Sequence, residues 1–159
     1  MEIERKFLIK ELSFSLSEFE CAEIVQSYLT EDGISPERRI RSFAVKGNTK
    51  YFLTEKSGAG MVRREDEREI SRDDYEKFRA SVIGEDIIKT RYFIPLDGDL
   101  TVELDVYGEK LSGLCVAEVE FRSVDDALSF IAPNWFGDEI TEDKRYKNRS
   151  LSKNGLPEN

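Results

Sequence analysis

The sequence predicts a mainly β protein of the α+β class, in which eight antiparallel strands close into a barrel, or tunnel, with a few covering helices. Two observations support this fold. Eight short segments alternate polar and apolar residues with the period of a β-strand, and turn-forming residues separate several of them. Eight strands is also the number that closes into a small barrel with room for a ligand inside.

The predicted strands occupy most of the chain between residues 2 and 122. They lie near residues 2–10, 22–30, 37–45, 49–57, 62–70, 88–94, 100–107 and 115–122. Turn signals between them include Asp32-Gly33, Gly47-Asn48, Gly58-Ala59-Gly60 and Asp97-Gly98. No internal repeat or low-complexity linker divides the series, so we expect one domain over residues 1–159.

Three helices are expected between or after the strands. The first runs from Ser71 to about Val82 with Gly84 as its stop, and the second from Ser123 to Ile131; both begin with a capping Ser-x-x-Asp pattern. The third runs from Thr141 through Leu151, which makes residues 123–152 the C-terminal helical segment. A helical turn is also expected within residues 10–20. The positions predicted to be buried are Tyr75, Phe78, Val82, Ala127, Phe130 and Ile131, with Trp135 and Phe136 favoured as core over an exposed interface.

Composition and charge exclude several classes of function. Thirty-three acidic residues outweigh 24 basic ones, and this net charge of −9 opposes binding to nucleic acid. No apolar run is long enough to span a membrane, and the first residues lack the apolar stretch of a signal peptide. Cys21 and Cys115 are far apart, which suits reduced cysteines in the cytoplasm. Without histidine, a bound metal would rest on carboxylates, as Mg²⁺ or Mn²⁺ does.

The charged residues fall on one face of each predicted strand, because residues two apart in a strand share a face. The third strand carries only arginines on this face, and the last two carry only acids. Taken in chain order, these charged positions are Glu2, Glu4, Lys6, Arg39, Arg41, Lys50, Lys56, Arg63, Glu65, Glu67, Lys89, Arg91, Glu103, Asp105, Glu118 and Glu120.

Two interpretations of this face remain open for any single strand. A sheet with one solvated face shows the same alternation, but a solvated face would mix the two signs within each strand. Segregated signs favour a charged interior, which must hold water and a ligand that complements both signs, because unpaired buried charges are costly. A polyphosphate with divalent cations is such a ligand: basic side chains contact its oxygens, and carboxylates hold the metal.

The sequence resembles the CYTH family of triphosphate tunnel metalloenzymes, in its short bacterial single-domain type. Segments from almost the whole chain carry this resemblance. They are Glu2-x-Glu4-x-Lys6, Gln26-Ser27-Tyr28-Leu29, Arg39-Ile40-Arg41, Tyr51 to Lys56, Arg63-x-Glu65-x-Glu67, Lys89-Thr90-Arg91-Tyr92, Glu103 to Val106, Ala117 to Phe121, and Thr141 to Tyr146. The chain departs from the family pattern at Ser27 and Glu55. Both are predicted to point outward, so the departures concern packing.

The resemblance implies a role for each charged position. The metal carboxylates would be Glu2, Glu4, Glu118 and Glu120, and four more acids would either join them or hold the bases in place: Glu65, Glu67, Glu103 and Asp105. The phosphate ligands would be Lys6, Arg39, Arg41, Lys56, Arg63, Lys89 and Arg91. Lys50 is added because it shares a strand face with Lys56, and Arg145 is expected at the tunnel mouth. One or two Mg²⁺ or Mn²⁺ ions per site are implied.

The implied reaction is hydrolysis of a phosphoric anhydride bond by attack of water on a terminal phosphoryl group. Inorganic triphosphate is the favoured substrate, because no aromatic clamp for an organic ring is evident. A thiamine triphosphatase, a nucleoside triphosphatase, a class IV-type adenylate cyclase and a non-catalytic polyphosphate- or nucleotide-binding module are the alternatives. With no histidine available, Lys6 and Tyr28 are one candidate for the catalytic base; Tyr28 as a core aromatic is an equal alternative. Oligomeric state stays open, a homodimer included.

Overall fold

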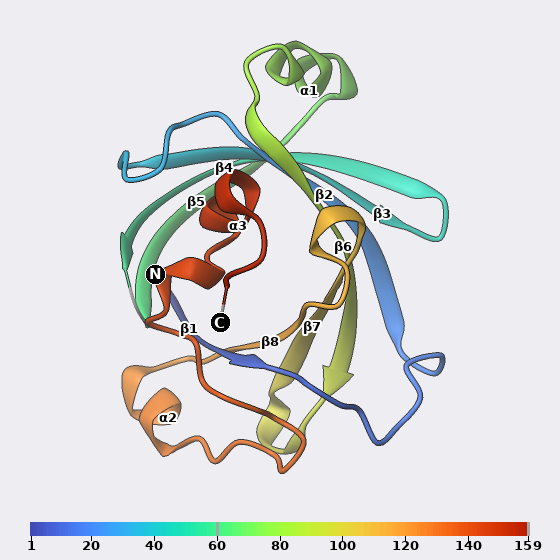
Figure 1. Cartoon of the computed structure of the whole chain (residues 1–159), viewed down its shortest axis with the longest axis vertical. Helices are drawn as coiled ribbons and strands as arrows, with labels where there is room; N and C mark the ends of the chain where they lie inside the picture. The colour runs from blue at the N-terminus through green and yellow to red at the C-terminus, as the bar shows by residue number, and fades with distance from the viewer. Residues whose placement is uncertain (60, 159) are drawn as a thin grey trace.

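A computed structural model describes residues 1–59 and 61–158 of the chain. Eight antiparallel strands form a closed barrel in the order β1-β5-β4-β3-β2-β6-β7-β8 (Figure 1). The strands are β1 (Glu2–Leu8), β2 (Glu20–Tyr28), β3 (Glu37–Val45), β4 (Asn48–Ala59), β5 (Val62–Ile70), β6 (Ile83–Pro95), β7 (Thr101–Tyr107) and β8 (Cys115–Glu120). The predicted fold class is therefore confirmed. Gly60, part of one predicted turn, lies outside the described residues.

The largest difference in strand length is at the start of β6. Residues 83–87 do not alternate clearly and were expected to connect a helix to the strand, with Gly84 as the helix stop. Instead, a register shift in β2 between Gln26 and Tyr28 lets Tyr28 pair with Ile83, and the strand begins there. Gly84 has φ +73°, and a Cβ at this position would lie 2.9 Å from Ser152 Oγ, so glycine permits close packing of the C-terminal helix.

The first two helices begin as predicted. The Ser71 hydroxyl accepts from the Asp74 amide at the start of α1 (Arg72–Arg79), and Ser123 accepts from Asp126 at the start of α2 (Val124–Ser129). The predicted burial of Ile131 is wrong: α2 ends before it, and its side chain is 89% exposed. Residues 10–20 hold one hydrogen-bonded turn between Leu16 and Phe19 and no helix.

The predicted helix from Thr141 through Leu151 is wrong in its first half. The Thr141 hydroxyl does not cap a helix, since it accepts from the Lys6 amide at 3.0 Å and donates to Glu139 at 2.6 Å. A short 3₁₀ turn, η3 (Lys144–Tyr146), follows, and the extended ψ of Lys147 separates it from α3 (Asn148–Asn154). As predicted, a glycine follows the end of this helix, with Gly155 at φ +75°.

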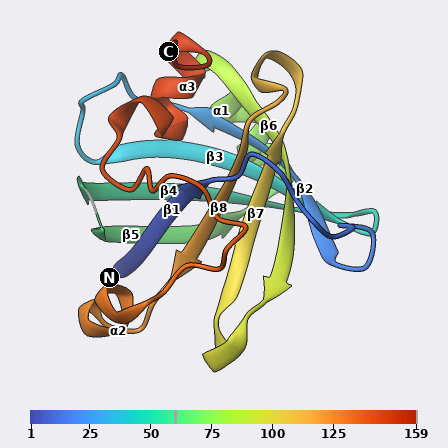
Figure 2. The ribbon, with the colours of Figure 1, turned by 60° about the horizontal axis from the view of Figure 1, so that its bottom comes forward.

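Apolar side chains pack mainly on the outside of the barrel. The outer faces of β7 and β8 are covered by α2 and by residues 9–19 and 130–136, including the predicted core pair Trp135 and Phe136. A second cluster is formed by Tyr28, Ile87, Tyr107 and Val116 with Leu151 of α3, which packs against one end of the barrel. Figure 2 shows α2 and α3 at well-separated places on the barrel. None of the described helices is long and apolar enough to cross a bilayer.

The C-terminal segment also seals the barrel beside β1. That strand pairs with β8 over five residues but with β5 over only two. β5 begins at Val62, opposite Ile3, so it does not extend along the second half of β1. Residues 137–141 pair there instead: Ile140 N donates to Lys6 O, and Phe7 forms a β-bridge with Glu139. The position of Lys6 therefore depends on chain more than 130 residues away.

The two departures from the family pattern lie outside the cavity, as predicted. Ser27 is fully buried and donates to Asp86 at 2.7 Å, while Arg79 of α1 forms two hydrogen bonds with the same carboxylate. Ser27 thus helps to fasten α1 to the barrel. Glu55 is exposed and lies 3.5 Å from Arg38.

Candidate functional site

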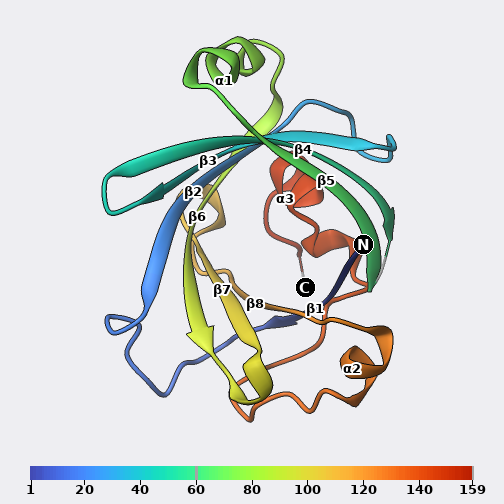
Figure 3. The same cartoon turned by 180° about the vertical axis from the view of Figure 1, so that it is seen from behind.

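The interior of the barrel is a polar cavity of about 320 Å³. Side chains from all eight strands line it, together with residues from the start of α3. Its lining consists of Glu2, Glu4, Lys6, Gln26, Tyr28, Glu37, Arg39, Arg41, Phe43, Lys56, Arg63, Glu65, Glu67, Arg91, Phe93, Glu103, Glu118, Glu120, Lys147, Asn148 and Arg149. The charged face predicted for each strand therefore points inward. In Figure 3, α3 is seen within the ring of strands.

The cavity lining holds equal numbers of the two signs. Its eight acids are Glu2, Glu4, Glu37, Glu65, Glu67, Glu103, Glu118 and Glu120, and its eight bases are Lys6, Arg39, Arg41, Lys56, Arg63, Arg91, Lys147 and Arg149. The protein as a whole has a net charge of −9. The cavity is thus formally neutral within a strongly acidic molecule, which suits a ligand that brings both signs with it.

Antiparallel pairing places the acids of β1 and β8 next to each other. Glu4 pairs with Glu120, and Lys6 pairs with Glu118. Glu4 is 8% exposed, and Arg63 lies 3.9 Å from it, too far for a hydrogen bond. Burial and the nearby Glu118 charge raise the pKa of Glu4 to about 7. A cation in the cavity would favour the charged form of this carboxyl.

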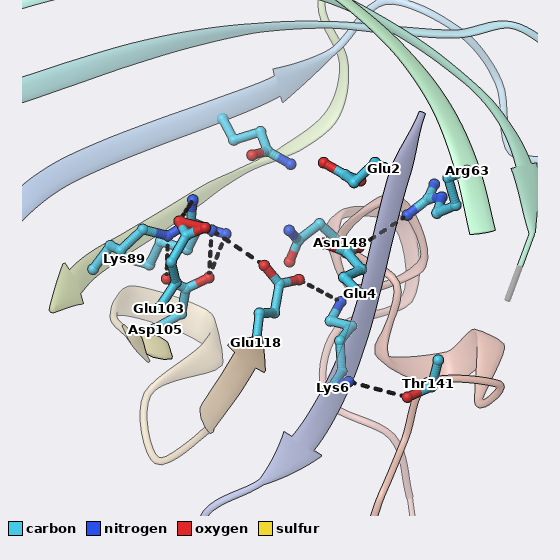
Figure 4. A network of polar contacts seen from close by, with 12 residues as sticks. Glu2, Glu4, Lys6, Arg63, Lys89, Glu103, Asp105, Glu118, Thr141 and Asn148 are labelled. Atoms are coloured by element: carbon cyan, nitrogen blue, oxygen red, sulfur yellow. Dashed lines mark hydrogen bonds and ion pairs between the residues drawn. The ribbon is translucent and has the colours of Figure 1, made fainter. Parts of the chain in front are cut away.

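Glu118 lies between two cationic side chains (Figure 4). Lys6 Nζ is 3.4 Å from one of its oxygens, and Arg91 Nη2 is 3.6 Å from the other. Burial raises the pKa of Glu118, but the charges of Lys6, Arg91 and Lys89 outweigh burial and hold this pKa well below its usual range. Glu118 is therefore ionised, and it fixes the Lys6 ammonium group at the cavity wall.

A second charged network lies behind this one, around β6 and β7. Asp105 accepts two hydrogen bonds from Arg91, at 2.8 and 3.0 Å, and lies 2.8 Å from Lys89 Nζ. Arg91 also lies 2.7 Å from Glu103. Lys89 and Asp105 are almost fully buried and do not line the cavity. Their position indicates that they orient Arg91.

Four arginines of the cavity lining carry a buried N–H group without a partner. The Nε atoms of Arg39, Arg41 and Arg63 and the Nη1 atom of Arg149 are buried and have no hydrogen-bond partner in the described part of the chain. Arg39 reaches its nearest carboxylates, Glu37 and Glu65, only at 3.8 and 3.9 Å. Because buried polar groups are normally hydrogen-bonded, these arginine side chains mark a site for an anion. Lys56 of β4, in contrast, donates a hydrogen bond from Nζ to a Glu2 carboxylate oxygen at 2.9 Å.

The structure does not bring the proposed catalytic pair together in a hydrogen bond. The Tyr28 hydroxyl accepts from Gln26 at 2.6 Å, whereas Lys6 lies beside Glu118. Burial raises the pKa of the Tyr28 phenol well above its usual value, so this group stays protonated near neutral pH. These observations favour Tyr28 as a buried aromatic over Tyr28 as a base.

Two further predicted phosphate ligands lie away from the cavity lining. Lys50 is exposed, beyond the rim of the barrel, although its strand face is the predicted one. Arg145 is also exposed and forms an ion pair of 2.7 Å with Asp143. Neither residue therefore lines the cavity.

Seven lining residues were absent from the predicted site. Glu37, Phe43 and Phe93 share strand faces with predicted residues, and Gln26 shares one with Tyr28. The alternation of faces along a strand could therefore have located these four residues. Lys147, Asn148 and Arg149 carry no such signal, because their position depends on how the C-terminal segment folds back over β1. Phe43 and Phe93 lie with Phe52 in an aromatic cluster with ring centroids 6.4 and 6.5 Å apart. An aromatic group therefore lies beside the charged residues, although the sequence shows no evident aromatic clamp for an organic ring.

The acids of the cavity suit a hard cation by their chemistry. Carboxylate oxygens are the ligands that Mg²⁺ and Mn²⁺ prefer, and Glu4 keeps a raised pKa that a bound cation would relieve. Among the described residues, however, no three acids or cysteines are already arranged around one point. Most of the carboxylates are paired with lysine or arginine, so metal binding would require some of these ion pairs to rearrange.

Comparison with known proteins gives consistent results, although no family model matches the chain. The chain is 43% identical over 151 residues to an inorganic triphosphatase from Nitrosomonas europaea. This match covers 95% of this chain and 96% of that protein. An inorganic triphosphatase from Acetivibrio thermocellus is 31% identical over 154 residues, or 96% of this chain and 94% of that protein.

Solved structures show the same barrel. A crystal structure of an inorganic triphosphatase matches with a TM-score of 0.70 at 39% identity, and the match covers 99% of this chain and 97% of that one. A putative adenylyl cyclase from Hippeastrum with a dominant triphosphatase activity matches with a TM-score of 0.64 over 80% of this chain and 83% of its own. At 17% identity, the latter shows a shared fold alone.

Proposed function

Because the chain belongs to the family of the inorganic triphosphatases, we propose that it hydrolyses inorganic triphosphate to diphosphate and phosphate inside the barrel. The reaction class is hydrolysis of a phosphoric anhydride bond. The observation that carries the proposal is the formally neutral cavity of eight acids and eight bases, in whose lining four arginines have a buried N–H group without a partner among the described residues. We also propose that the chain belongs to the CYTH group within the triphosphate tunnel enzymes, acts in the cytoplasm and requires no nucleic acid or membrane.

The balance of charge supports a substrate that binds together with cations. A bare triphosphate is a multiply charged anion, and it would leave the eight acids of the lining unpaired. Divalent cations bound to the phosphate oxygens reduce its charge and bind carboxylates at the same time. We propose that Glu2, Glu4, Glu118 and Glu120 hold such an ion, Mg²⁺ or Mn²⁺. When bound, the metal neutralises phosphate oxygens and activates or orients water.

The bases divide into groups with different surroundings. Arg39, Arg41 and Arg63 have free N–H groups and are proposed to bind phosphate oxygens. Lys6 and Arg91 are each already ion-paired with Glu118, so they are held in place before the substrate arrives. Lys89 and Asp105 support Arg91 from behind. Rigid positioning of charge is the main source of rate in phosphoryl transfer.

A specific observation also favours a second substrate class. Phe43 and Phe93 line the cavity at the end away from α3, and an open depression beyond them shares Phe93, Glu103 and Glu120 with it. An organic triphosphate could place a planar ring there while its phosphates occupy the charged part of the barrel. Nucleoside and thiamine triphosphates are therefore candidate secondary substrates.

Phosphate release from four compounds tests the proposal. With Mg²⁺ present, we expect kcat/KM for tripolyphosphate to exceed that for ATP and thiamine triphosphate, and diphosphate to be left intact. If organic triphosphates are secondary substrates, Phe43→Ala should lower their kcat/KM more than that of tripolyphosphate. Equal rates for ATP and tripolyphosphate would contradict the inorganic assignment, and formation of cyclic AMP would indicate a cyclase. Tight binding of triphosphate without phosphate release would indicate a binding module.

The replacement Tyr28→Phe tests whether the phenol acts as a base. Because the pKa of Tyr28 is raised and its hydroxyl is hydrogen-bonded to Gln26, we expect kcat to change by less than about threefold. Stability should fall by roughly 1 kcal/mol through the lost hydrogen bond. A loss of kcat of a hundredfold or more, estimated from general-base catalysis as about 10²–10⁴, would restore the Lys6–Tyr28 pair.

A further inference from the structure

Asn148 is a polar residue of the cavity lining, and only one end of its side-chain amide has a hydrogen-bond partner among the described residues. It is the first residue of α3 and lines the cavity between Lys147 and Arg149. Its side chain does not cap the helix. Instead, the Tyr107 hydroxyl donates to Asn148 Oδ1 over 2.6 Å, from a strand 41 residues away. The Asn148 side chain can be followed in Figure 4, where it reaches in among the charged residues of β1 and β8.

Tyr107 holds this amide from a rigid position. The tyrosine is 4% exposed and belongs to the apolar cluster in which Leu151 packs against the barrel end. Its ring also lies 5.4 Å from the Lys89 ammonium group. Burial raises the pKa of the Tyr107 phenol well above its usual value, so the hydroxyl keeps its proton. It donates this proton to Asn148 Oδ1, and the oxygen end of the amide therefore faces Tyr107.

The other end of the amide is left free for a ligand. With Oδ1 directed to Tyr107, the Asn148 NH₂ group has no hydrogen-bond partner among the described residues, and the residue is only half-buried. The rest of α3 cannot easily move, because Arg149 Nε donates to Thr30 O over 2.9 Å and Leu151 is buried. The amide is therefore a fixed donor at the closed end of the cavity.

We infer that Asn148 is a substrate-binding residue whose NH₂ group donates to the phosphoryl group at the α3 end of the cavity, and that Tyr107 is its positioning residue. This inference rests on the proposed function. A neutral donor suits this place, because it binds a phosphate oxygen without disturbing the balance between acids and bases in the lining. Lys147 and Arg149 supply positive charge on either side of it.

The variant Asn148→Asp tests the direction of the amide. Aspartate keeps the shape of the side chain and an oxygen for Tyr107, but it replaces the NH₂ donor by an anionic oxygen. We expect KM for tripolyphosphate to rise by about 10- to 100-fold with a smaller change in kcat, as for loss of a hydrogen bond to a charged group. In Tyr107→Phe, which frees the amide to rotate, KM should rise by about 3- to 10-fold. Tyr92→Phe, which removes a hydroxyl from the outer face of β6, is the control and should leave KM unchanged.

A second measurement separates binding from structural damage. Stabilisation of the protein by excess tripolyphosphate and Mg²⁺, followed as a shift in Tm, should shrink in Asn148→Asp and Tyr107→Phe but not in Tyr92→Phe. A Tyr107→Phe variant with a lower Tm but unchanged KM and unchanged ligand-induced shift would show a purely structural role. Tighter binding by Asn148→Asp in Mg²⁺ would show that the amide oxygen faces a cation instead. If the wild-type protein released no phosphate from tripolyphosphate at all, the proposed function would fail, whereas the Tm measurement would still test the binding role of Asn148.

Discussion

The variant Glu4→Gln is expected to lose phosphate release from tripolyphosphate by at least about a thousandfold while remaining folded. Glutamine has nearly the same shape as glutamate, but its neutral amide is a poor ligand for Mg²⁺, and metal-ion catalysis contributes several kcal/mol of charge stabilisation. Glu4 lies in the wall of the cavity beside Glu120 on the neighbouring strand. The loss should appear mainly in kcat and should not be recovered by raising the Mg²⁺ concentration.

The stability of this variant has a predictable pH dependence. Glu4 has a pKa of about 7 in the folded protein and an ordinary value of 4.5, so the folded state binds its proton more tightly than the unfolded state does. The free energy of unfolding that Glu4 contributes therefore falls as pH rises from about 4.5 to about 7. Glu4→Gln removes this ionisation. Without divalent cations, its stability relative to wild type should improve between pH 5 and pH 8, by on the order of 2 kcal/mol.

Chemical denaturation at pH 5 and pH 8 measures this effect, with Glu55→Gln as the matched control. Glu55 is an exposed glutamate on the outer face of β4, so its replacement should change neither activity nor the pH dependence. If Glu4→Gln unfolded at both pH values, Glu4 would be a structural member of an ion pair with Arg63 instead of a metal ligand.

The second large effect is expected for Arg41→Ala, with a loss of kcat/KM for tripolyphosphate of about 10²- to 10³-fold. The Arg41 guanidinium has a buried Nε without a partner, and its one carboxylate, Glu67, lies at 3.3 Å. Burial lowers the pKa of Arg41, and the nearby charges of Arg91 and Arg39 lower it further. The side chain is therefore held at a cost in the empty cavity, and a bound phosphate would relieve this cost.

Arg38→Ala is the control for this experiment. Arg38 follows the same strand but faces outward toward Glu55, so its removal should leave kcat/KM within about twofold, as for most exposed ion pairs. Thermal unfolding should show Arg41→Ala within about 1 kcal/mol of wild type, because lost packing on Phe43 and Phe52 offsets the relieved repulsion. A variant that kept its activity would place the phosphates elsewhere in the barrel.

The strands and the charged interior could be predicted from the sequence because both depend on a period of two residues. The period of two put Glu4, Arg41 and Glu118 each on the charged face of its own strand, and the hypothesis that all charged faces point inward brought them together. The alternation of strand faces does not tell how far along the barrel axis a residue lies. For this reason, Lys50 was expected inside but lies beyond the rim, and Lys89 was expected at the cavity but lies behind Arg91.

The C-terminal segment could not be predicted in the same way. Its helical pattern was continuous from Thr141 to Leu151, and no local signal showed that residues 137–141 would pair with β1. That pairing is a long-range contact, and it draws Thr141 onto the Lys6 amide and breaks the helix at Lys147. As a result, the three residues that close the cavity, Lys147 to Arg149, were missed. The contact between Phe43 and Phe93 could not be predicted for a related reason, because the two residues are 50 positions apart in the chain.

Phosphate release from tripolyphosphate by the wild-type protein, with and without divalent cation, tests whether the neutral two-sign cavity binds a triphosphate and its cations as one complex and hydrolyses it. The predicted result is release of one phosphate per tripolyphosphate in Mg²⁺ or Mn²⁺, abolished by EDTA and restored when excess cation is added back. Hydrolysis at an undiminished rate in EDTA would show that the cavity needs no cation, and no hydrolysis with either cation would show that the protein is not a triphosphatase.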